Sequence, residues 1–257
     1  MRVRLVDATV ISEPASKGTN WRVHLGYNLQ HDAIDHIELT DVKGGETLTR
    51  FSIQPGEIVV GDRGYAHRRG LHSVIKTGGD FLVRLNWNTV PLQTCDGKKF
   101  DLFKSLQGLK DAEPGDFAVQ SAPSKRDGIP PIKGRLIAIR KTAEATKAAR
   151  LKIKRISSKK GQHTDKRTFE TAEYVFLFTS VDSSQASAQA LLDLYRFRWQ
   201  IEIAFKRMKG LLNLGELPIK DPDLARTYLY AKLLAALILQ DLTEVYLGFS
   251  PWGFNFP

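Results

Sequence analysis

The chain has 257 residues, of which 42% are hydrophobic, so it is long enough to bury a full core and too apolar to be disordered by default. Its formal net charge of +10 favours a polyanionic partner. The single cysteine, Cys95, excludes a disulfide within the chain and a cysteine-based zinc site, and it favours a reducing compartment.

Residues 1–85 predict a mixed sheet with helices packed against it. Apolar or alternating segments separated by polar turns predict strands at residues 4–11, 21–29, 33–42, 57–65 and 80–85. A short helix is expected over 45–51 and a longer one over 66–78. The expected order is therefore three strands, helix, strand, helix, strand.

Residues 86–180 change in character and predict a mostly β insertion. Strand patterns at 117–122, 134–140 and 172–180 are broken by Gly, Pro and Asp clusters, and residues 145–161 predict a basic helix. Residues 141–170 contain ten Lys/Arg against three Asp/Glu, a net +7. This local excess favours a phosphate backbone as partner, although a solvated basic surface gives the same pattern.

Residues 181–257 predict two long helices. The first is expected to begin near Ser183, a good N-cap, and to run to about Leu212, and the second covers residues 223–246. At about 100° per residue the first helix has a core stripe and beside it a narrow polar face. That face holds Tyr195, Arg198, Glu202, Lys206 and Lys209. A solvated face in which Glu202 pairs with its basic neighbours is the simpler alternative.

Three acids stand in unusual places. Asp7 lies in the middle of an apolar strand, where an unpaired carboxylate is costly, and Asp62 ends another apolar strand. Glu202 is the one acid among basic and aromatic residues on the long helix. Three carboxylates from these positions suit Mg²⁺ or Mn²⁺, and two such ions would support phosphoryl transfer.

The spacing Y-x2-R-x3-E-x6-K, formed by Tyr195, Arg198, Glu202 and Lys209, resembles the signature of a large group of bacterial insertion-sequence transposases. The segment GDRGY at 61–65 is similar to the motif that holds their second aspartate, and VDAT at 6–9 is similar to the strand that holds the first. The resemblance covers residues 1 to about 240. It implies an RNase H-like α/β core, a mixed sheet flanked by helices, with a mostly β insertion before the helix that carries the third acid.

The resemblance also implies roles for single residues. Asp7, Asp62 and Glu202 would be the catalytic triad and would bind two Mg²⁺ or Mn²⁺ ions for DNA cleavage at the ends of an insertion sequence, followed by strand transfer. Phosphate contacts are expected from the side chains of Tyr195, Arg198 and Lys209, with Lys206 and Arg63 as further DNA-binding candidates. Tyr174, on the last strand before the helix, is the candidate for stacking on a flipped base, and a core position in the sheet is its alternative.

The expected partners are the DNA of the transposon ends and of the target, bound by a dimer assembled on DNA. No signal peptide or membrane span is predicted, which favours the bacterial cytoplasm. Two alternatives remain: a catalytically inactive DNA-binding remnant, and an RNase H-like nuclease without strand transfer. The chain begins almost at the first acidic strand, so a fragment, or a decayed or separately encoded part, is expected. Its predicted parts are 1–85, 86–180 and 181–257.

Overall fold

The structure is a computed structural model that describes residues 2–16, 18, 20–109, 113–161 and 163–245. Two compact units divide the chain. The terminal unit combines Arg2–Glu46 with Arg198–Pro257, and the central unit is Thr47–Phe197. Both predicted part boundaries, at 85/86 and 180/181, lie inside the central unit. Among the described helices, none is long and apolar enough to cross a membrane.

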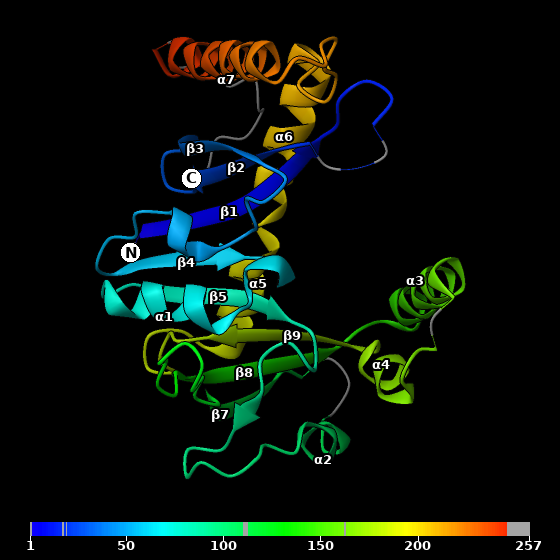
Figure 1. Cartoon of the computed structure of the whole chain (residues 1–257). Helices are drawn as coiled ribbons and strands as arrows, with labels where there is room; N and C mark the ends of the chain where they lie inside the picture. Colours follow the sequence, from blue (N-terminus) through cyan, green and yellow to red (C-terminus); the bar gives the residue numbers. More distant parts are fainter. Residues whose placement is uncertain (1, 17, 19, 110–112, 162, 246–257) are drawn as a thin grey trace. The chain divides into compact units, whose positions relative to one another are not determined.

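The terminal unit is an antiparallel three-stranded meander covered by two helices (Figure 1). Its elements are β1 (Arg2–Ile11), β2 (Trp21–Asn28), β3 (Ala33–Asp41), α6 (Trp199–Leu212) and α7 (Pro222–Val245). Strand β2 lies between the other two and is buried along almost its whole length, although its sequence alternates between apolar and polar residues. Helix α6 packs on β1 and α7 on β3. The Gln240 amide fixes α7 by bonding both the backbone N–H and the C=O of Ile34, at 2.7 and 3.3 Å.

The central unit contains a mixed sheet with the strand order β4-β5-β9-β8-β7-β6. Its strands are β4 (Glu57–Gly61), β5 (Asp80–Leu85), β6 (Leu92–Gln93), β7 (Gly115–Ser121), β8 (Lys133–Arg140) and β9 (Tyr174–Thr179). Strands β4 and β5 are parallel and the other neighbouring pairs are antiparallel. The strands of residues 86–180 thus continue the sheet that β4 and β5 begin. The Phe81 and Phe178 rings meet in its core, with centroids 5.1 Å apart.

Helical elements of the central unit connect these strands. They are η1 (Leu48–Arg50), η2 (Arg63–Tyr65), α1 (Arg68–Lys76), α2 (Leu102–Gln107), α3 (Ala143–Lys160), α4 (Lys166–Thr171) and α5 (Ala188–Arg196). Helix α1 links the parallel strands β4 and β5 and packs on β5. Helices α3 and α4 lie beyond the carboxyl end of β8 (Figure 1). No residue of α3 is buried, which agrees with its basic composition.

The predicted order of elements over residues 1–85 is confirmed, and so are the strands and the basic helix of 86–180. The prediction of one continuous helix from Ser183 to Leu212 is wrong. The segment forms two helices, α5 and α6, which separate at Phe197 and Arg198. Tyr195 therefore lies on α5, apart from the residues of the signature that follow. Residue 246, the predicted end of the last helix, is outside the described residues.

Candidate functional site

Arg198 joins two of the three predicted acids within the terminal unit. Its Nη1 donates to Oδ2 of Asp7 at 3.5 Å, and its Nη2 donates to Oε1 of Glu202. The side chains of Arg198 and Asp7 are largely buried, at 18% and 16% exposure, whereas Glu202 is 47% exposed. One guanidinium thus forms ion pairs with both carboxylates.

The local folding explains why these acids meet. Asp7 is in the middle of β1, opposite Leu25 of β2, and its Oδ1 accepts the Ala8 N–H at 2.8 Å. Helix α6 packs on β1 through the apolar stripe that its sequence predicts, and Ile201, Ala204, Phe205 and Met208 are buried. Burying this stripe sets the rotation of α6 and leaves Glu202 at the margin of the contact.

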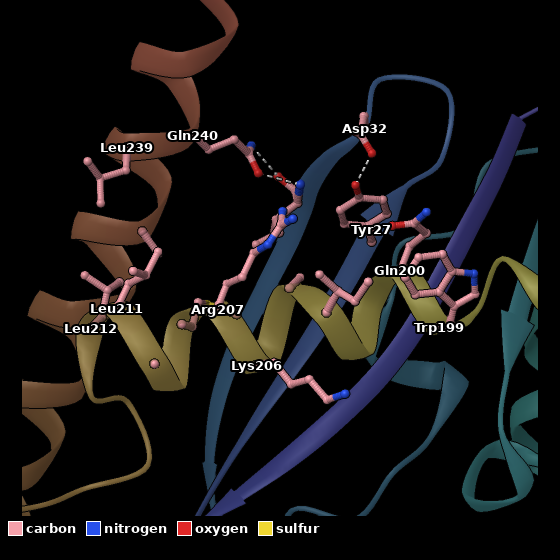
Figure 2. Close-up of a pocket in the computed structure, with 16 residues that line it drawn as sticks. Tyr27, Asp32, Trp199, Gln200, Lys206, Arg207, Leu211, Leu212, Leu239 and Gln240 are labelled. Carbon is pink, nitrogen blue, oxygen red and sulfur yellow. Dashed lines mark hydrogen bonds between the residues drawn. The ribbon is translucent and has the colours of Figure 1, made fainter. Parts of the chain in front are cut away.

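The exposed face of α6 carries the rest of the predicted polar set. Glu202, Lys206 and Lys209 are all exposed and follow one another at helical spacing. Figure 2 shows the Lys206 side chain on the opposite side of α6 from Arg207 and Tyr27. Three of the predicted DNA-binding side chains, those of Arg198, Lys206 and Lys209, thus belong to α6 or its N-cap.

Asp62, the third predicted acid, belongs to the central unit. It follows β4 and caps the short helix η2, where its Oδ1 accepts the Gly64 N–H at 2.7 Å. The parallel register pairs Gly61 with Val83, so Asp62 and Arg84 follow at the same level of the sheet. Asp62 is thus placed at the carboxyl ends of two parallel strands, a usual location for ligand sites in α/β sheets.

Two cations near Asp62 were not predicted, Arg84 and Lys141. The pKa of Arg63 lies below its ordinary value, first because of burial and next because of the positive charge of Arg84. Burial, together with the charges of Arg84 and Arg63, lowers the pKa of Lys141 to about 8. Tyr195 of α5 also interacts electrostatically with Arg63. An arginine in the apolar strand DFLVRL was the one sequence signal for Arg84.

Tyr174 begins β9, as predicted, and it is only 9% exposed. Its hydroxyl accepts a hydrogen bond from Nη2 of Arg140 at 2.8 Å, and its ring stacks on Phe176. A hollow of about 250 Å³ adjoins it, lined by Phe103, Leu106, Gln107, Arg140, Glu170, Glu173 and Tyr174. The ring is therefore part of the sheet and also part of the wall of this hollow.

The residues of the terminal unit fit a divalent ion in their chemistry. Carboxylate oxygens are the ligands that Mg²⁺ and Mn²⁺ prefer, and the Arg198 guanidinium already lies between two of them. Over the described residues, no three His, Cys, Asp or Glu side chains gather into a cluster that holds an ion by itself. Asp7 and Glu202 thus contact the same arginine within the terminal unit, whereas Asp62 belongs to the central unit.

A separate cavity of about 650 Å³ lies in the terminal unit, between α6, α7 and the β2–β3 turn (Figure 2). Its wall is mostly apolar and includes Ile203, Leu211 and Leu239. The Tyr27 hydroxyl donates a hydrogen bond to Asp32, and both residues line the cavity. Burial is the main cause, and this hydrogen bond the second, of a pKa of Tyr27 far above its ordinary value. Neither Asp7 nor Glu202 lines this cavity.

The fold has a counterpart among solved structures. The piggyBac transposase, in a synaptic complex with hairpin DNA, matches 91% of this chain and 45% of its own chain with a TM-score of 0.53 and 7% sequence identity. This likeness confirms the predicted RNase H-like α/β fold. The fold class is therefore that of the RNase H-like proteins.

The chain belongs to the transposase DDE domain family, whose model matches residues 1–238. The transposase for insertion sequence element IS421 of Escherichia coli is 36% identical over 253 residues, which are 97% of this chain and 68% of the relative. The transposase for IS231D of Bacillus thuringiensis subsp. finitimus is 22% identical over 92% of this chain and 55% of the relative. The family confirms the predicted class of enzyme, one that acts on DNA.

Proposed function

We propose that the chain is the catalytic domain of an insertion-sequence transposase, which cleaves DNA at the ends of the element and transfers the freed strand. The single observation that carries this proposal is the arrangement of Asp7 and Glu202 on the two sides of Arg198, in a chain that belongs to this family. Asp62 is proposed as the third acid because it ends the parallel strand β4 in the motif GDRGY.

The three acids would hold two Mg²⁺ or Mn²⁺ ions. When bound, such ions activate a nucleophile and stabilise the leaving oxygen of a phosphodiester. Asp7 would supply a ligand that is fixed by the sheet, since β1 is paired along its length and Asp7 is largely buried. The more exposed Glu202 on α6 would supply a ligand that adjusts to the substrate.

The basic residues would hold the DNA. Arg198, Lys206 and Lys209 present their charges from α6, and Arg63 presents its charge beside Asp62. Tyr195 on α5 would bind the same phosphates as Arg63, because the two side chains interact electrostatically. Holding the cut end in this way favours its transfer over its release. A dimer on paired ends is proposed with this function.

Tyr174 is proposed to contact a displaced base through the hollow beside it. The hollow combines the Phe103 and Tyr174 rings with the polar side chains of Gln107 and Glu173. Aromatic faces and hydrogen-bonding groups are what a flipped base requires. The Arg140 hydrogen bond would keep the Tyr174 ring in position during such a contact.

Nicking of supercoiled plasmid DNA in Mn²⁺ tests the proposed function without knowledge of the element's ends. Glu202→Gln, Asp7→Asn and Asp62→Asn should each reduce nicking by more than about 100-fold, the size expected when a charge-stabilising group leaves such a site. Their affinity for DNA should not fall. Asp241→Asn, which changes an exposed acid on α7 in the same way, is the control and should nick like the wild type.

The outcome also separates the two alternatives. DNA binding without nicking by the folded wild type would favour a catalytically inactive remnant. Nicking without joining of a labelled 3′ end to the plasmid would favour a nuclease. Equal nicking by Glu202→Gln and the wild type would contradict the assignment of the acids.

A further inference from the structure

Three cations of the central unit meet at one edge of its sheet. Strands β4, β5 and β8 run in the same direction, because β4 is parallel to β5 and both β5 and β8 are antiparallel to β9. Their carboxyl ends therefore lie at a common edge. Arg63 follows β4, Arg84 is the last residue but one of β5, and Lys141 directly follows β8.

The strand register sets the level of each cation at this edge. Leu177 of β9 pairs with Arg84 on one side and with Ile137 on the other, so β8 extends past this level to reach Lys141. The Lys141 ammonium donates to the carbonyl of Ala172 at 2.6 Å, which holds it at the edge. The charges of Arg84 and Arg63 both act on Lys141, so the three groups lie within electrostatic reach.

In the part of the chain that the structure describes, no carboxylate forms an ion pair with Arg63, Arg84 or Lys141, although the charge of Asp62 acts on Arg63. Nε of Arg84 is buried, and it has no hydrogen-bond partner there. Bringing like charges together in a partly buried place costs free energy, and an anion that binds all three recovers it.

The surface beyond the three cations is basic as well. Thr142 caps α3 directly after Lys141, so the basic helix starts from the same edge. Arg150 of α3 pairs with Glu173, and the guanidinium of Arg167 of α4 lies 4.5 Å from the ring centroid of Trp87. These contacts fix α3 and α4 beside the ends of β5 and β8 (Figure 1).

We propose that Arg63, Arg84 and Lys141 form a phosphate-binding cluster that holds the DNA backbone beside Asp62, with α3 extending the contact along the strand. The inference rests on the proposed function for its choice of DNA as the polyanion. It adds Arg84 and Lys141, outside the signature and the acidic motifs, to the residues that position the substrate. The contact is with the backbone and carries no sequence preference.

The salt dependence of DNA binding tests the cluster, measured by fluorescence anisotropy with a labelled duplex of arbitrary sequence and without divalent ions. Each lost phosphate contact should lower the slope of log K against log salt by about 1, and it should weaken binding about tenfold at 50 mM salt. Lys141→Gln and Arg84→Gln should both show this change. Lys141→Arg, which keeps the charge, should bind like the wild type.

Lys76→Gln is the matched control. Lys76 is exposed at the end of α1, before the amino end of β5 and thus at the opposite edge of the sheet. An effect of net charge alone would make Lys76→Gln and Lys141→Gln equal, and this result would overturn the proposal. Circular dichroism checks that each variant is folded. If Arg84→Gln is unfolded, Lys141→Gln and Lys141→Arg suffice for the test.

The test is independent of catalysis, because binding is measured without divalent ions. If the wild type does not nick DNA but the cluster variants lose binding, the cluster stands and the proposed function fails. If the wild type nicks DNA and Lys141→Gln binds with the slope of the control, the cluster fails and the proposed function stands.

Discussion

Arg140 and Tyr174 are partners across the pair of strands β8 and β9. The guanidinium Nη2 donates to the tyrosine hydroxyl at 2.8 Å, and its central carbon lies 5.4 Å from the ring centroid. The register places the two residues directly opposite each other. The tyrosine is therefore held by a hydrogen bond and by a cation–π contact at the edge where β8 ends.

Tyr174→Phe should weaken the fold slightly and leave DNA binding unchanged. It removes the hydroxyl and keeps the ring, so the expected loss in the free energy of unfolding is about 1 kcal/mol, the net value of one such hydrogen bond. Urea denaturation measures it. Tyr230→Phe, at an exposed position on α7, should lie within about 0.5 kcal/mol of the wild type. An equal effect in both variants would show that the Arg140 bond does not stabilise the fold.

Tyr174→Leu tests the proposed base contact. The ring is then lost, so a 2-aminopurine placed near the cleavage position should be quenched less on binding than with the wild type, because stacking on an aromatic face is removed. Tyr174→Phe should quench like the wild type. If leucine and phenylalanine give the same fluorescence, the ring contacts no base and Tyr174 is a residue of the sheet only.

Arg198→Ala should tighten the binding of Mn²⁺ in the absence of DNA. The guanidinium occupies Asp7 and Glu202 as a competing cation, and a partly exposed ion pair contributes about 1 kcal/mol, so removing it should increase the Mn²⁺ affinity about fivefold. Titration calorimetry measures this change. The Mn²⁺ affinity of Arg198→Lys should lie between those of the wild type and Arg198→Ala.

The control for this experiment is Arg196→Ala, two residues earlier, where the arginine pairs with Asp193 and is 77% exposed. Its Mn²⁺ affinity should equal that of the wild type. Weaker Mn²⁺ binding in Arg198→Ala alone would mean that Arg198 orients the two acids rather than competing with the ion.

Lys141 should make DNA binding depend on pH near 8. Its pKa is lowered to about 8 by burial and by the charges of Arg84 and Arg63, so it loses its proton between about pH 7 and 9. Phosphate binds the protonated form, and the affinity for DNA should therefore fall as the pH rises through this range. Lys141→Arg should remove this dependence, since arginine stays charged. A pH profile that is the same in both would assign the titration elsewhere.

The lowered pKa of Lys141 affects folding in the opposite direction: the fold should become more stable as the pH rises, whereas DNA binding should weaken. A lysine whose pKa is lowered in the folded state binds fewer protons there than in the unfolded chain, between about pH 8 and its ordinary value near 10.4. The free energy of unfolding should thus gain a contribution that rises with pH over this window, and Lys141→Met should lack it. Thermal denaturation between pH 8 and 10 measures the difference.

Asn213 ends α6 in the left-handed conformation, with φ of 49°. Glycine adopts this conformation without strain, whereas alanine is strained by about 1 kcal/mol or more. Asn213→Gly should therefore preserve the stability of the chain and Asn213→Ala should lower it, as measured by urea denaturation. Equal stability of Asn213→Gly and Asn213→Ala would mean that the turn relaxes, even though the Lys232 ammonium donates a hydrogen bond to the Asn213 C=O.

The sequence predicts the elements well where a pattern is set by burial. The alternation in β2, the apolar run of β5 and the spacing of Ile201, Phe205 and Met208 identify two strands and a core-facing helix. The division between α5 and α6 is different. Phe197 and Arg198 both keep helical backbone angles and no proline or glycine separates the helices, so the local sequence carries no signal for it.

The acids of the candidate site can be predicted from the sequence, whereas two of its cations cannot. Asp7 and Glu202 are found from their placement against the hydrophobic pattern and from the resemblance of their motifs. Arg84 and Lys141 are 57 residues apart along the chain, and only the pairing of β5 and β8 with β9 places both at one edge of the sheet. Strand pairing of this kind depends on the whole sheet, which no short motif encodes.

The terminal unit combines two segments that are far apart in the sequence, Arg2–Glu46 and Arg198–Pro257. During synthesis, β1–β3 leave the ribosome about 150 residues before α6, a delay of roughly 10–30 s at ordinary rates of translation. Arg198, the ion-pair partner of Asp7, is made only after this delay, whereas the central unit with its basic edge is complete earlier. A product that stops before α6 would thus retain the proposed cluster of Arg63, Arg84 and Lys141 and lack Glu202, and we expect it to compete with the finished chain for the same DNA.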